Sequence, residues 1–187
     1  MFVRVLWIGH FRGSCAAAWT SPRWAWSGGF EAYFCTPKGA AIFGWAGVDG
    51  IHYCFIRGFG GMVFAVSPMN AAPDCVHPLA RDFADFLRLL LACGDAAALE
   101  QAWMWEEAQF DAFLRENPPT AEQEACLSAL AARLQLTPME HPWAYLRELQ
   151  ASFDPGKIKY TEEYYDVTGC PAAEPAAPDW KVFFDGG

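Results

Sequence analysis

The sequence lacks the features of a membrane or secreted protein. No window approaches the roughly 20 consecutive apolar residues that a membrane-spanning helix requires. Two arginines, Arg4 and Arg12, interrupt the apolar start of the chain, and no cleavage site follows, so a signal peptide is not predicted. The segment Phe2–Ile8 fits a first β-strand better. We therefore expect a cytoplasmic protein with no membrane partner.

Catalytic and metal-binding motifs are also absent. The sequence contains no GxSxG, P-loop, HExxH or Rossmann glycine pattern. Its seven cysteines are an odd number and no two have CxxC spacing, which argues against a disulfide framework and against a zinc site. Most of them are expected to be small buried apolar residues in a reducing compartment. We expect no catalytic residue, no metal and no cofactor.

Positive charge is scarce and unevenly distributed. The chain carries 13 Lys and Arg against 22 Asp and Glu, a formal net charge of −9. Residues 1–60 have a net charge of +3, so the remainder carries −12. An acidic surface repels nucleic acid and favours basic partners. The alternative is that the acidity only keeps the protein soluble.

Residues 39–67 have the pattern of a short antiparallel meander. The dipeptide Asp49-Gly50 favours the positive φ angles of a hairpin turn. The flanking segments are apolar on both faces, which is typical of strands covered on both sides. The predicted strands are Gly39–Ala46, Ile51–Arg57 and Met62–Ser67.

An amphipathic helix is predicted after the meander. Pro78 suits its first turn, where the missing N–H costs nothing, and Gly94 suits a left-handed C-terminal cap. An apolar stripe at helical spacing would close a core against the sheet. The stripe consists of Phe83, Phe86, Leu87 and Leu90.

The chain after Gly94 is predicted to be mainly helical. A first helix over 95–116, with a break near Trp105, ends at Asn117-Pro118-Pro119. Thr120 and Gln123 form the capping box of a second helix, and a third begins at Pro142. Residues 158–165 look like an irregular aromatic arm. Residues 170–178 look like an Ala/Pro linker, and residues 180–184 look like a last short strand.

The predicted elements indicate one α+β domain over residues 1–187. An antiparallel sheet in the N-terminal half is packed by helices, and the C-terminal half is helical. The expected divisions are a sheet-rich part (1–68), a helical part (78–153), and an arm, linker and last strand (154–187). No internal repeat and no second core is evident.

A histidine and a cysteine could in principle carry chemistry. His52 and Cys54 share one face of the strand predicted over 51–57, where they could supply two metal ligands or a nucleophile pair. Further ligands and a nucleophile signature are missing, so two buried core residues are the preferred interpretation. The rival hypothesis is a small enzyme with a His/Cys-containing pocket on the sheet. An accessible His52 with a convergent polar partner would favour it.

Two groups of residues are candidates for binding a partner. Trp24 and Trp26 lie in a segment that looks looped, and aromatic residues on loops are favoured contact anchors. They could instead plug the open end of the sheet. The second group comprises Glu106, Glu107 and Asp111, continued by Glu116, Glu122 and Glu124 and relieved only by Arg115. Its alternative interpretation is a solvated helix face.

Residues 39–93 resemble the SUKH superfamily, which includes a fungal cell-wall-synthesis regulator and many bacterial immunity proteins. The resemblance lies in the run GVDGIHYCFIRGFGGMVFAVSPMN and in PLARDFADFLRLLL, where family helix positions are matched by Ala80, Phe83, Phe86 and Leu87. The predicted N-terminal strands, the tryptophan-rich loop and the long helical C-terminal half have no counterpart in the family pattern.

The SUKH resemblance implies an α+β fold and a non-catalytic role, in which the protein binds and blocks a toxin, often a nuclease, from neighbouring bacteria. A basic nuclease would suit the acidic part of this chain electrostatically. A structural adaptor anchored by the tryptophans is a third hypothesis. The sequence leaves the oligomeric state open.

Overall fold

A computed structural model describes residues 32–46 and 49–171 of the chain. These residues form a four-stranded antiparallel sheet followed by six α-helices, which confirms the predicted α+β class. The strands lie side by side in the order of the sequence. They are β1 (Ala40–Trp45), β2 (His52–Ile56), β3 (Val63–Val66) and β4 (Val76–Ala80).

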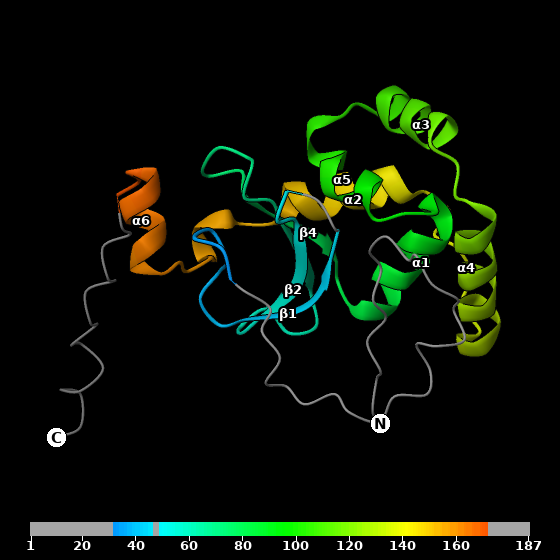
Figure 1. The fold of residues 1–187 in the computed structure, drawn as a ribbon, viewed down its shortest axis with the longest axis horizontal. Coiled ribbons are helices and arrows are strands. Elements are labelled where there is room, and N and C mark those ends of the chain that lie inside the picture. Colours follow the sequence, from blue (N-terminus) through cyan, green and yellow to red (C-terminus); the bar gives the residue numbers. More distant parts are fainter. Residues whose placement is uncertain (1–31, 47–48, 172–187) are drawn as a thin grey trace, which may run out of the picture.

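The helices form the second layer and an outer shell. They are α1 (Phe83–Cys93), α2 (Ala97–Gln101), α3 (Glu107–Glu116), α4 (Ala121–Leu134), α5 (Pro142–Ser152) and α6 (Glu162–Thr168), with 3-10 turns η2 (Ala102–Met104) and η3 (Pro155–Lys157). Figure 1 shows α1, α2 and α5 beside the sheet, α3 and α4 further out, and α6 at the opposite end of the molecule.

The predicted meander is confirmed. Strands β1, β2 and β3 fall inside the three predicted segments, and Asp49 and Gly50 have φ angles of 51° and 70°. The N–H of Ala46 donates to the carbonyl of Ile51 at 2.9 Å, which closes the β1–β2 connection. Positive φ at both residues is what this dipeptide was expected to supply.

The prediction for Pro78 was wrong. Pro78 lies in β4, opposite Phe64 of β3, rather than in the first turn of a helix. Because β4 is an edge strand of the sheet, a residue without an N–H is tolerated there. Helix α1 begins at Phe83 instead, and its N-cap Asp82 accepts a hydrogen bond from the N–H of Asp85 at 2.9 Å. The helical part of the chain therefore starts after residue 82.

The two faces of the sheet are covered differently. Tyr53 and Leu79 face the helices and share a core with buried residues of α1, α2, α3, α4 and α5. Cys54 and Phe64 point to the other face, where Ile158 and Tyr164 cover them. The segment predicted as an irregular arm therefore contains the start of α6 and packs on the sheet, with a backbone hydrogen bond of 2.7 Å from the N–H of Lys38 to the carbonyl of Lys159.

The remaining helix predictions are confirmed in outline. The long helix is interrupted between η2 and α3, at Trp105, and Thr120 and Gln123 cap α4 reciprocally. Gly94 ends α1 with a φ of 77°. Four cysteines are buried free thiols, as expected: Cys35, Cys54, Cys75 and Cys93. Cys126 is disulfide-bonded, which the cysteine count and spacing did not predict. The strand predicted over Phe2–Ile8, most of the linker and the last strand lie outside the described residues.

Within residues 32–46 and 49–171, no helix combines the length and the apolar character that a membrane span would require.

Candidate functional site

A pocket of about 270 Å³ lies where β4, η2 and α5 meet. The strand contributes His77, the 3-10 turn contributes Trp103, and α5 contributes Arg147, Gln150 and Ala151. His77 faces the helices because side chains alternate along β4 and its neighbour Val76 belongs to the opposite face. Three distant parts of the sequence are thus brought to one concave site.

An aromatic pair forms one wall of this pocket. The rings of His77 and Trp103 are stacked, with centroids 4.5 Å apart and an interplanar angle of 14°. His77 Nε2 lies 3.1 Å from the carbonyl oxygen of Asp74, and since a carbonyl only accepts, Nε2 must carry the proton. Burial lowers the pKa of His77, so the neutral ring with Nδ1 as an acceptor is favoured.

Three polar atoms of the pocket residues are buried without a hydrogen-bond partner. They are the indole nitrogen Nε1 of Trp103 and both amide atoms, Nε2 and Oε1, of Gln150. A buried donor or acceptor without a partner costs about 1–3 kcal/mol relative to a satisfied one. Such groups are rare in folded proteins, so their concentration at one pocket calls for an explanation.

Arg147 places a positive charge beside the same pocket. Its Nη1 donates to the carbonyl oxygen of Trp103 at 2.8 Å, which fixes the guanidinium next to η2. No carboxylate of the described residues forms an ion pair with it. The neighbouring carboxylate, Glu148, instead pairs with Arg81 at 2.8 Å. Arg147 therefore keeps donors available for another group.

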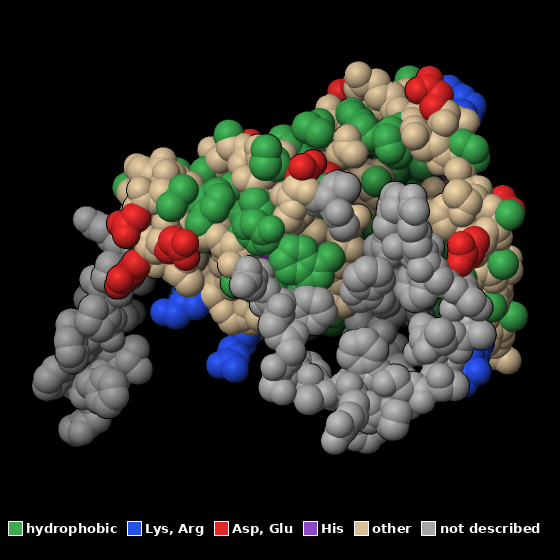
Figure 2. All heavy atoms as spheres, in the orientation of Figure 1, with side chains coloured by type: hydrophobic (Ala, Val, Ile, Leu, Met, Phe, Trp, Pro, Cys, Tyr) green, Lys and Arg blue, Asp and Glu red, His purple; other side chains and the backbone are tan. Residues whose placement is uncertain are grey.

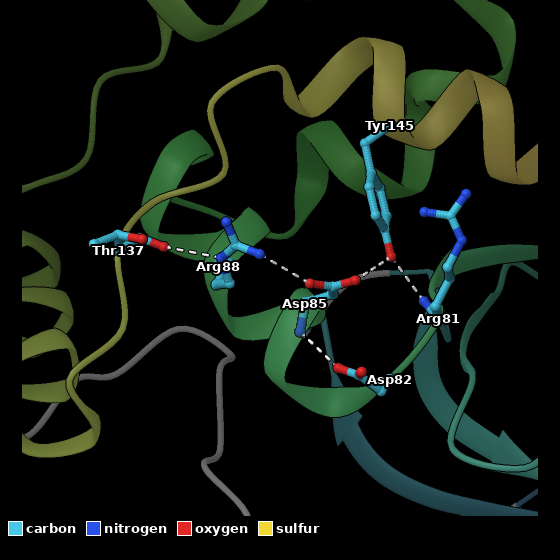
Figure 3. A network of polar contacts seen from close by, with 6 residues as sticks. All are labelled: Arg81, Asp82, Asp85, Arg88, Thr137 and Tyr145. Atoms are coloured by element: carbon cyan, nitrogen blue, oxygen red, sulfur yellow. Dashed lines mark hydrogen bonds and ion pairs between the residues drawn. The ribbon is translucent and has the colours of Figure 1, made fainter.

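A satisfied polar network holds α5 in place (Figure 3). The hydroxyl of Tyr145 donates to Asp85 Oδ2 at 2.8 Å and accepts the backbone N–H of Arg81 at 2.9 Å. Arg88 Nη1 reaches Asp85 Oδ1 at 3.2 Å, and its Nε reaches the carbonyl of Thr137 at 3.3 Å. The network ties the start of α5 to β4 and α1, and so positions the pocket wall on the same helix.

The acidic residues predicted to bind a partner lie on and just before α3. Glu106, Glu107 and Asp111 are all exposed, and none forms an ion pair with another described residue. Phe110, with 0% exposure, anchors α3 in the core and turns this face outward. Glu106 also has a structural role as the N-cap of α3, where its N–H donates to Gln109 Oε1 at 2.9 Å.

The acidic cluster continues onto α4. Glu116 at the end of α3, and Glu122 and Glu124 in the first turn of α4, are exposed as well. Figure 2 shows acidic side chains over α3, α4 and α6 on the face drawn there. The structure therefore places the predicted cluster on two consecutive outer helices.

Trp24 and Trp26, the other candidate partner-binding residues, lie outside the described residues. The structure tests neither the contact-anchor hypothesis nor the alternative that they plug the sheet. Both therefore stay predictions.

His52 has the environment of a core residue. It is 0% exposed, its Nδ1 lies 2.8 Å from the carbonyl of Gly50, and its Nε2 lies 3.1 Å from Thr36 Oγ1. Burial lowers its pKa, and the rings of Tyr33 and Trp45 stand at 6.0 and 5.1 Å. With both ring nitrogens engaged, His52 has no free edge for a substrate. The residues described contain no group of three or more His, Cys, Asp or Glu placed to hold a metal ion.

Sequence reasoning missed the pocket altogether. Its lining residues are far apart in the chain, and residues 78–80 of the strand that carries His77 were predicted to be helical. One local signal was present, because Arg147 and Gln150 are three residues apart on a predicted helix and so share a face. The helix break near Trp105 was a second signal, since it leaves Trp103 in a terminal turn.

No protein-family model, curated protein or solved structure matches the chain. The resemblance to SUKH proteins therefore stays a prediction.

Proposed function

We propose that the protein is a non-catalytic binding module that holds a basic protein partner on its acidic surface. This surface is defined by six exposed carboxylates of α3, its N-cap and the first turn of α4: Glu106, Glu107, Asp111, Glu116, Glu122 and Glu124. The single observation that carries the proposal is that these carboxylates are exposed and unpaired among the described residues.

Electrostatics makes such a surface suitable for a basic partner. Like charges four residues apart on one helix, as at Glu107 and Asp111, repel each other and destabilise it slightly. A basic partner would relieve that repulsion and would be steered toward the surface before contact. Attraction of this kind weakens as salt is added, because the Debye length is about 8 Å at physiological ionic strength.

The resemblance of residues 39–93 to SUKH proteins supports a narrower version of the proposal. In that version the protein is a bacterial immunity protein, and the basic partner is a toxin such as a nuclease. The residues that carry the resemblance include Phe86 and Leu87, which are core residues of α1. These core residues support a SUKH-like scaffold. The negative charge of the outer helices α3 and α4 supports a basic partner.

The test is a pair of charge-reversal variants with equal change in net charge. Glu107→Lys/Asp111→Lys reverses the acidic surface, and Glu162→Lys/Glu163→Lys reverses two exposed residues of α6 as the matched control. Each full-length protein is immobilised, captured proteins are identified, and the captured partner is purified. Its association rate with each variant is then measured at two salt concentrations.

The proposal predicts a basic partner whose association slows about tenfold or more for the α3 variant and changes little for the α6 control. For the narrower version, a captured nuclease should be inhibited by the wild-type chain. Equal association with the two variants, or a partner that is acidic, would contradict the proposal.

The two other hypotheses have less support. An enzyme built on His52 would need an accessible ring, whereas both ring nitrogens of His52 are engaged and the ring is buried. A structural adaptor anchored by Trp24 and Trp26 depends on residues outside the described part of the chain.

A further inference from the structure

The geometry points to a second binding site: the pocket between β4, η2 and α5 binds a small organic carboxylate that carries an N–H or O–H group beside the acid. This inference does not depend on the acidic surface, which lies on other helices. It rests on four side chains that line one pocket: Trp103 and Gln150, whose buried polar atoms lack partners, and Arg147 and His77, which retain donors and an acceptor beyond their bonds to backbone carbonyls.

The donors of the pocket fit a carboxylate. Arg147 uses Nη1 on the carbonyl of Trp103 and retains further N–H groups of its planar fork, the geometry that matches a carboxylate. The Trp103 indole N–H is a donor only and has no partner. An acid group between these two side chains would satisfy a buried donor and neutralise an unpaired cation together.

The acceptors of the pocket fit a neighbouring donor group on the ligand. Gln150 Oε1 has no partner, and His77 Nδ1 is left as an acceptor once Nε2 donates to Asp74. The Gln150 amide and the Trp103 indole N–H are both shielded from solvent in this conformation, but the terminal side-chain torsions of both residues are broad, so a modest rotation can turn their polar atoms toward a ligand. A ligand with only a carboxylate would leave these acceptors unsatisfied.

The size and charge of the site limit the ligand further. A volume of about 270 Å³ suits a molecule of the size of an acylated amino acid rather than a larger cofactor. The net charge of −9 repels anions at long range, but salt screens that repulsion beyond about 8 Å, and Glu148 is neutralised by Arg81. Two sources share the required chemistry: a free acylated amino acid and the C-terminus of a peptide.

The experiment uses the Trp103 indole N–H as a reporter at the site. Full-length protein with ¹⁵N-labelled tryptophan is titrated with N-acetylglycine and, separately, with N-acetylglycinamide, which has the same shape without the charge. The Trp103 resonance is assigned by its loss in Trp103→Phe. We expect a saturable downfield shift with the acid, and at least tenfold weaker binding of the amide.

Two variants separate binding from folding. Arg147→Gln should weaken binding of N-acetylglycine at least tenfold, whereas Arg115→Gln, an exposed arginine of α3 with the same charge change, should not alter it. Gln150→Leu should weaken binding several-fold while the protein stays folded, as checked by an unchanged or raised melting temperature. Loss of binding with Arg115→Gln would show a general charge effect and overturn the inference.

The source of the carboxylate is distinguished by a third probe. The peptide N-acetyl-Ala-Ala-Gly with a free C-terminus should bind more tightly than N-acetylglycine when a peptide end is the natural ligand, and no more tightly when a free acid is. Either result supports the carboxylate site. An unmoved Trp103 resonance with every acid, or equal binding of acid and amide, would overturn it.

Discussion

Tyr145 in the first half of α5 and Gln150 in the second half differ in whether their polar atoms have hydrogen-bond partners. In the first half, the Tyr145 hydroxyl both donates and accepts, and the carboxylate of Asp85 is engaged through both oxygens. In the second half, both amide atoms of Gln150 are buried without a partner. Since one helix carries both, a general looseness of packing does not account for the difference.

The contrast separates polar groups that build the fold from polar groups that the fold leaves available. A polar network adds stability when its members are satisfied, and a buried member without a partner lowers stability. The Tyr145 network is of the first kind, because it joins α5 to β4 and α1 (Figure 3). The Gln150 amide is of the second kind, because both of its polar atoms are buried without a partner. This pattern is expected of a binding site that lowers the stability of the unliganded protein.

The largest expected effect on the free energy of unfolding comes from weakening the packing of the whole of α5 against the core. Leu146 lies beside Tyr145 in sequence and is 0% exposed in the core that the helices share. Leu146→Ala should lower the free energy of unfolding by about 2–5 kcal/mol, from lost burial and the cavity left behind. Urea denaturation measures it, with Leu134→Ala, a 48% exposed leucine of α4, as control. Equal losses in both variants would contradict the assigned core.

Removing one hydroxyl should weaken the satisfied half alone. Tyr145→Phe deletes the bonds to Asp85 and to the N–H of Arg81 and should cost about 1–2 kcal/mol of unfolding free energy. The same denaturation experiment measures it, and Tyr165→Phe on α6 is the matched control. A neutral Tyr145→Phe would show that the network does not stabilise the docking of α5.

Removing the Gln150 amide should raise, rather than lower, the free energy of unfolding. Gln150→Leu replaces two unsatisfied buried atoms with apolar ones and should raise the unfolding free energy by about 1 kcal/mol. Gln123→Leu is the control, because that amide is engaged with Thr120 and Asp95 and its loss should destabilise. If Gln150→Leu also destabilised the protein, the amide would have a structural partner, and the contrast between the halves would fail.

The smallest expected effect is a dependence of stability on pH, which should have opposite directions for Tyr145 in the satisfied network and for His77 in the pocket. Burial raises the pKa of Tyr145 to about 12, so stability should fall as the pH rises above about 10, where the unfolded tyrosine ionises. Burial lowers the pKa of His77, so stability should fall as the pH drops below about 6.5, where the unfolded histidine protonates first. Melting temperatures across pH should show a smaller alkaline slope in Tyr145→Phe and a smaller acid slope in His77→Phe. The remainder of each slope comes from Tyr53, Tyr160, Tyr164 and His52, whose pKa values burial shifts in the same directions. Unchanged slopes would contradict both shifts.

The elements with regular local patterns could be predicted from the sequence. The stripe of α1, the Asp49-Gly50 turn and the capping box at Thr120 are each fixed by residues close together in the chain. Pro78 misled the prediction because proline suits both a first helical turn and an edge strand, and only the pairing of β4 with β3 decides between them.

The site was predictable only in part, for a related reason. Glu106, Glu107 and Asp111 are neighbours in sequence, so their common exposure on α3 followed from helical spacing. The pocket depends on His77, Trp103 and Gln150 meeting in space, and that meeting is set by the docking of α5 on β4. No local pattern encodes which side chains a docked helix leaves without partners.

The covering of the second sheet face by Ile158 and Tyr164 has a consequence for the order of synthesis. The four strands and α1 leave the ribosome long before residues 158–164, so the face with Cys54 and Phe64 has an incomplete cover while α2 to α5 are being made. Exposed apolar surface of this kind makes a nascent chain prone to aggregation and a substrate for chaperones. Synthesis of residues 158–164, rather than completion of the sheet, is therefore the step at which this face becomes covered.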